Sequence, residues 1–99
     1  MNQMQQMLMN AQRMQKALQK AHDALAEKEF AVSKNGIVEL VMLGNRQIKS
    51  LIIDKDALEP DNAEMISDAL QLALNEALEK IQAENDKIEE EITGKTGLF

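Results

Sequence analysis

Three cations in the first quarter of the chain, Arg13, Lys16 and Lys20, offer the clearest chemistry. Their steps of three and four residues place side chains on one line of an α-helix. Every formal charge before Asp23 is positive, although the whole chain carries a net charge of −6. Such a line can contact nucleic-acid phosphates, but it also fits a solvated helix face or a face that pairs with an acidic helix. The spacing alone leaves these three interpretations open.

The other titratable residues do not form a recognisable site. His22 is the only histidine and the chain has no cysteine, so we expect His22 to face solvent or to pack between helices. The carboxylates from Asp54 to Glu64 do not match a calcium loop. Its sixth and twelfth positions would require Gly and Glu, but Glu59 and Met65 occupy them.

A phosphate-binding loop and a catalytic centre are also not expected. Gly94-Lys95-Thr96 resembles the end of a phosphate loop, but residue 89, where that motif needs glycine, is glutamate. No serine or threonine has an evident base to activate it. We therefore expect no enzyme, no catalytic residue, no metal or cofactor, and no small-molecule substrate.

The composition predicts one small domain over residues 1–99, with residues 93–99 as a flexible tail. With two Phe and no Trp or Tyr, base stacking on aromatic platforms is not expected. The chain shows neither a secretory leader nor a membrane-length apolar run, so we expect a cytoplasmic protein with no membrane partner. Charge is segregated, because residues 54–92 hold thirteen acids against three lysines.

Apolar residues at alternating steps of three and four predict a helix from about residue 2 to residue 28. Neither Gly nor Pro interrupts it. Its packing line consists largely of Met and Ala, and Met fills irregular gaps and specifies a partner only loosely. The packing line, called the seam below, consists of Met4, Met7, Ala11, Met14, Leu18, Ala21 and Leu25.

The middle of the chain predicts a three-stranded antiparallel meander. Its expected strands are residues 30–32, 37–43 and 48–53, and Asn35-Gly36 is a strong hairpin-turn signal. Alternation would put Ile48 and Ile52 on one face of the last strand. Both faces are largely apolar, so two helices can cover one face, and the other face then needs a partner or a long helix folded back over it.

A second helix is predicted over residues 65–92, after a connector at residues 54–60. Asp61 is the expected N-cap, with Glu64 completing a variant of the capping box. The apolar residues thin out after Ile81, which allows a bend near residues 82–86.

Several short stretches together suggest a family. They are Met4-Gln-Gln-Met7 through Ala11-Gln-Arg-Met14-Gln-Lys16, Leu25 leading to Phe30, Gly36-Ile-Val38, Gly44, Ile52-Ile-Asp54, Asp61–Glu64 and Ala73-Leu-Asn-Glu-Ala77. In order and spacing, over nearly the whole chain, they resemble the YbaB/EbfC-type nucleoid-associated proteins, which are small bacterial DNA-binding homodimers. The tail at residues 93–99 departs from the Gly/Pro-rich, Met-containing ending often seen there, and Glu89–Glu91 would repel phosphate.

The resemblance implies an α+β fold of order α-β-β-β-α, dimerised through the sheet region with projecting helices. It also implies duplex DNA binding with limited sequence preference, in the cytoplasmic nucleoid, serving bacterial chromosome organisation and gene regulation. No contact motif accompanies the resemblance, so we infer DNA-binding residues from charge alone: Arg13, Lys16, Lys20, Arg46, Lys49 and Lys95. The alternative is a non-enzymatic interaction module, in which the seam and the acidic helix bind another protein without touching DNA.

Overall fold

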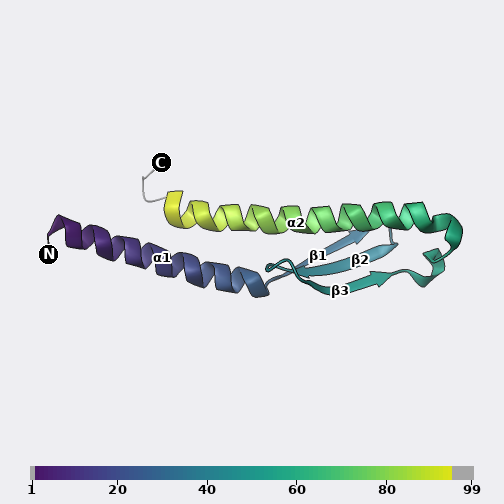
Figure 1. Ribbon diagram of the computed structural model, residues 1–99, viewed down its shortest axis with the longest axis horizontal. Coiled ribbons are helices and arrows are strands. Elements are labelled where there is room, and N and C mark those ends of the chain that lie inside the picture. The colour runs from purple at the N-terminus through teal and green to yellow at the C-terminus, as the bar shows by residue number, and fades with distance from the viewer. Residues whose placement is uncertain (1, 95–99) are drawn as a thin grey trace.

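The computed structural model describes residues 2–94. Its strands form one antiparallel sheet in the order β1-β2-β3 (Figure 1). The elements are α1 (Gln3–Glu27), β1 (Glu29–Lys34), β2 (Val38–Leu43), β3 (Ile48–Ile53), the short 3-10 turns η1 (Lys55–Ala57) and η2 (Pro60–Asn62), and α2 (Ala63–Thr93). This α-β-β-β-α order confirms the predicted α+β fold.

The first helix starts at a reciprocal cap that the sequence reasoning missed. The Asn2 side chain accepts a hydrogen bond from the Gln5 backbone N–H at 2.8 Å, and the Gln5 side chain accepts one from the Asn2 N–H at 3.4 Å. This capping box satisfies backbone donors that the first turn leaves without helical partners. At the other end the backbone of Lys28 is extended, so the chain leaves α1 directly into β1.

The core lies between α2 and the first two strands. A row of small side chains, Ala69, Ala73 and Ala77, is at most 1% exposed and lets α2 pack closely on the sheet. The apolar side chains buried with this row are Leu25, Phe30, Val32, Val38, Leu40, Met42 and Ile81. Figure 1 shows α2 running along one face of the sheet.

Of the two helices, only α2 lies along a face of the sheet. The alanine row occupies the face over β1 and β2, so α1 instead runs off the end of the sheet and beside the C-terminal half of α2 (Figure 1). The molecule is therefore a rod of 71 × 23 × 14 Å with a radius of gyration of 19.8 Å. A compact domain of this length would have a radius of gyration of about 13 Å.

The predicted hairpin turn is confirmed, but the face predicted for Ile48 on the last strand is wrong. Asn35 and Gly36 have φ of 56° and 66°, the left-handed backbone that a tight hairpin needs. Leu40 pairs with Leu51, as alternation predicts, but an irregularity between Val41 and Met42 brings Ile48 opposite Met42. A bulge adds a residue to one strand, which strict alternation cannot anticipate.

Two expectations about the second helix are also wrong. Asp61 lies within η2, and the residue before α2 is Asn62, whose side chain does not cap the helix but donates to the Ala57 carbonyl at 3.0 Å. The helix passes without a break through residues 82–86, where the Gln82 amide donates to Asp86 at 2.9 Å, one turn along. Of the predicted tail, Thr93 is the last residue of α2 and Gly94 is its C-cap, whereas Lys95 and the residues after it lie outside the described residues.

A tight backbone junction joins α1 to the turn between β2 and β3. The Gly44 N–H donates to the Lys28 carbonyl at 2.9 Å, and the Asn45 N–H donates to the Ala26 carbonyl at 3.2 Å. A Cβ atom on Gly44 would lie 1.7 Å from the backbone oxygen of Leu25. Only glycine fits there without moving α1 away from the sheet.

We expect Gly44→Ala to lower the free energy of unfolding by about 2 kcal/mol, the usual cost of overpacking. Urea titration followed by circular dichroism measures it. Gly94→Ala is the control, because that position has helical φ and ψ and no neighbour closer than 3.4 Å to the added carbon. Equal midpoints for Gly44→Ala and the unaltered protein would contradict this description of the junction.

An ion pair ties β1 to α2. Lys34 Nζ lies 2.7 Å from Glu76 Oε1, and Lys80 Nζ lies 3.9 Å from the other oxygen. The hydrogen bond from Lys34 holds the pKa of Glu76 below its ordinary value; partial burial opposes this, and the charges of Lys34 and Lys80 add to it. The carboxylate therefore stabilises the fold above the pKa of the unfolded chain, and this contribution is lost as pH falls through the folded-state pKa.

We expect Glu76→Gln to lower the Tm near neutral pH, and the difference from the unaltered protein to shrink in acid and to disappear only below the lowered folded-state pKa of Glu76, where both side chains are uncharged. Thermal melts across this range measure it. Glu79→Gln serves as control, because Glu79 is exposed and forms no ion pair within residues 2–94. A Tm difference that persists unchanged in acid would contradict the assignment.

Candidate nucleic-acid interface

The cationic stripe, defined as Arg13, Lys16 and Lys20, lies on the exposed surface of α1. The helix is continuous through all three, so their spacing does place them on one line. The ion pairs found within residues 2–94 involve other cations. Within the described chain, the positive charge of the stripe is thus not matched by a carboxylate.

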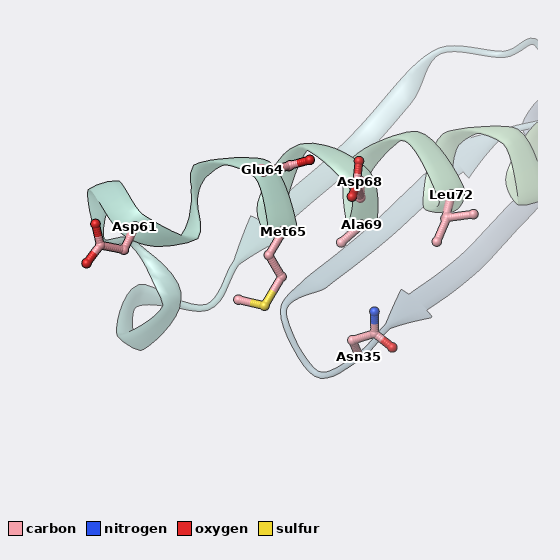
Figure 2. A pocket seen from close by; sticks show the side chains of 7 residues that line it. All are labelled: Asn35, Asp61, Glu64, Met65, Asp68, Ala69 and Leu72. Atoms are coloured by element: carbon pink, nitrogen blue, oxygen red, sulfur yellow. The ribbon is translucent and has the colours of Figure 1, made fainter.

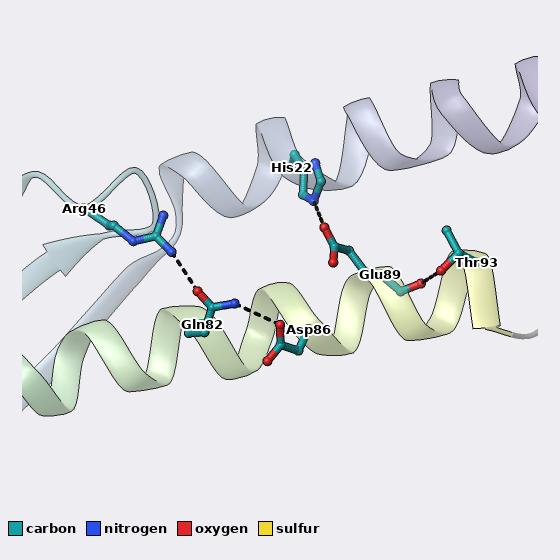
Figure 3. A network of polar contacts seen from close by, with 6 residues as sticks. All are labelled: His22, Arg46, Gln82, Asp86, Glu89 and Thr93. Atoms are coloured by element: carbon teal, nitrogen blue, oxygen red, sulfur yellow. Dashed lines mark hydrogen bonds and ion pairs between the residues drawn. The ribbon is translucent and has the colours of Figure 1, made fainter. Parts of the chain in front are cut away.

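The acids of α2 approach α1 beyond the stripe. Lys28, just after α1, pairs with Glu84 at 3.1 Å and lies 5.4 Å from the centroid of the Phe30 ring. His22 Nε2 lies 3.9 Å from Glu89 Oε1 (Figure 3). That nitrogen is buried and has no hydrogen-bond partner among the described residues. Packing of His22 between helices was one of the two sequence-based expectations, but the carboxylate partners depend on how the two helices align and have no sequence pattern of their own.

The other cations inferred from charge do not gather at the stripe. Arg46, in the turn between β2 and β3, donates to Gln82 Oε1 at 3.3 Å (Figure 3). Lys49 forms an ion pair with Glu29 at 2.9 Å across the strands. Lys95 lies outside the described residues. The structure therefore brings together the three stripe cations and engages Arg46 and Lys49 in contacts of their own.

The seam is covered along only part of its length. Met4 and Met7 are 72% and 65% exposed, whereas Leu25 is 7% exposed. Met14, Leu18 and Ala21 lie between these limits, and Ala11 is exposed. In Figure 1 the N-terminal half of α1 extends past the end of α2, which explains the gradient. Leu8, 58% exposed, adds to this uncovered apolar surface.

A second surface feature lies at the far end of the rod. A shallow hollow opens between the start of α2 and the turn after β1 (Figure 2). We call it the acidic hollow; its lining residues are Asn35, Asp61, Glu64, Met65, Asp68, Ala69 and Leu72. Sequence reasoning interpreted the acids up to Glu64 as caps and a solvated loop and missed this surface, although Met65 and Leu72 lie seven residues apart with Asp68 between them.

No group of three or more His, Cys, Asp or Glu side chains in residues 2–94 is placed to hold a metal ion. None of the helices in that part of the chain has the length and apolar character needed to cross a membrane.

The sequence is similar to that of a known protein family. The model of the YbaB/EbfC DNA-binding family matches residues 1–96. The chain belongs to this family. The YbaB/EbfC resemblance noted from the sequence is thus confirmed over almost the whole chain.

Relatives in this family align with most of this chain and with most of their own length. A nucleoid-associated protein of Enterococcus faecalis is 40% identical over 87 residues, which are 87% of this chain and 84% of the relative. One of Metamycoplasma arthritidis is 39% identical over 83 residues, or 84% of this chain and 86% of its own. One of Chloroflexus aurantiacus is 36% identical over 101 aligned positions that span both chains completely.

Proposed function

We propose that this YbaB/EbfC-family member is a nucleoid-associated homodimer that binds duplex DNA through its phosphate backbone. It would act in the cytoplasmic nucleoid, without catalysis, in chromosome organisation and gene regulation. The observation that carries the proposal is the cationic stripe, which lies on a projecting helix with its charge unmatched in the described chain. The names of the relatives, all nucleoid-associated proteins, support the nucleoid assignment.

The geometry of the stripe suits backbone contact with little base readout. Arg13 and Lys20 lie seven residues apart, or about 10 Å along the helix. That length spans about three phosphates of one strand along a duplex axis. Gln12, Gln15 and Gln19 beside the stripe can donate to phosphates or to base edges. We therefore expect affinity from phosphate contacts and only limited sequence preference.

Dimerisation through the sheet region is supported by the surface of β3. The strand lies at the edge of the sheet, where an open strand tends to pair or to be covered. Ile48, Leu51 and Ile52 on it are 49%, 44% and 57% exposed. A second copy covering β3 would remove this apolar area from water and provide a second stripe.

We expect replacement of all three stripe cations by glutamine to weaken duplex binding and to remove most of its salt dependence. Six cations in a dimer give a log–log salt slope of about −5 if all contact phosphate. Fluorescence anisotropy with a short labelled duplex at several salt concentrations measures both quantities.

The matched control replaces Lys55, Lys80 and Lys87 with glutamine, which changes the net charge equally but leaves the stripe intact. It should bind DNA nearly as the unaltered protein does. An equal loss in both variants would show that only overall charge matters and would contradict the stripe. Absence of duplex binding even at low salt would instead favour the interaction-module alternative, for which the acidic hollow is the specific observation.

For the dimer, we expect the double change Leu51→Lys and Ile52→Lys to convert dimers to folded monomers, because it puts charge on both faces of β3. Light scattering coupled to size exclusion measures the mass, and circular dichroism confirms the fold. Ser67→Lys, at an exposed position of α2 away from β3, is the control and should stay dimeric. A dimer that survives the double change would place the interface elsewhere.

A further inference from the structure

The N-terminal half of α1 presents an apolar helix face that nothing in the described chain covers. Met4, Met7 and Leu8 are all more than half exposed, at 72%, 65% and 58%. The face continues the seam that packs against α2 farther along, so its spacing already suits contact with another helix. The charges beside it are positive until Asp23, which favours an acidic partner over a neutral or basic one.

The acidic hollow has the complementary pattern. Met65 and Leu72 are 44% and 54% exposed and lie seven residues apart on α2, the same interval that separates Met4 from Ala11 and Met7 from Met14 on α1. Asp61, Glu64 and Asp68 line the hollow with them, and no lysine or arginine does. Figure 2 shows Asn35 from the hairpin turn facing the start of α2 across the hollow.

Within one chain the two surfaces are too far apart to meet. The uncovered half of α1 forms one end of a rod 71 Å long, and the start of α2 lies toward the other end (Figure 1). Contact between two α1 helices would bring cations together, and contact between two hollows would bring acids together. Electrostatic repulsion therefore disfavours both contacts between like surfaces, and attraction favours contact between α1 of one copy and the acidic hollow of another.

We propose that the uncovered half of α1 docks into the acidic hollow of a second copy of this chain. The methionines and Leu8 cover Met65 and Leu72, while Arg13 and Lys16 face the acids of the hollow. A contact between unlike surfaces need not close on itself, so it links copies beyond any dimer formed through β3. The contact is ionic in part and weakens with salt.

Disulfide trapping tests the contact directly, because the chain has no cysteine of its own. Met7→Cys and Leu72→Cys are made as separate single variants, mixed at low salt and oxidised mildly. Both positions are exposed, so neither change should disturb folding. We expect the Met7→Cys and Leu72→Cys variants to cross-link to each other several times faster than either does to itself, with the rate falling as salt is added.

Two controls keep the test falsifiable. In the first, Leu78→Cys replaces Leu72→Cys; Leu78 is an exposed leucine on α2 outside the hollow, and its cross-linking should be slow. In the second, Asp61→Asn, Glu64→Gln and Asp68→Asn are added to Leu72→Cys, which should slow trapping several-fold. Equal rates for Leu72→Cys and Leu78→Cys, or trapping unaffected by loss of the three acids, would overturn the proposal. Neither result depends on whether the protein binds DNA.

Discussion

Close packing of the alanine row of α2 on β1 and β2 determines most of this structure. Because Ala69, Ala73 and Ala77 carry the smallest apolar side chains, α2 lies close on the sheet and leaves no room for α1 on the same face. The first helix is instead attached through its C-terminal half, by the covered part of the seam along α2, the backbone bonds at Gly44 and the ion pair from Lys28 to Glu84. A helix attached at one end projects, and the projection exposes the stripe and half of the seam.

The charge distribution follows from the same arrangement. The chain is acidic overall, which on its own disfavours contact with a polyanion. Several α2 carboxylates, however, engage cations on the sheet or at the end of α1: Glu76 with Lys34, and Glu84 with Lys28. The stripe lies farther along α1, outside these pairs. An exposed site of this kind would gain affinity from counterion release and would be sensitive to salt.

Sequence reasoning predicted the features that local chemistry determines. The 3.6-residue periodicity gave both helices, and Asn35-Gly36 gave the hairpin. It failed where tertiary contacts decide the outcome. The bulge at Val41 and Met42, the unbroken α2 at Gln82, and the position of α1 beyond the sheet depend on which surfaces meet in space. For the candidate site, helical spacing placed the stripe on one line, but the pairing of Lys49 with Glu29 follows from strand register and could not be read from the chain.

The most direct test of the central claim, that DNA contacts the projecting part of α1, is nuclear magnetic resonance. A short duplex would be titrated into isotope-labelled protein while the backbone amide signals are followed. We expect the largest shifts at the amides around Arg13, Lys16 and Lys20, and smaller shifts at those of Asp61, Glu64 and Asp68. Shifts centred on β3 or on the acidic hollow, with the stripe amides unchanged, would contradict the claim.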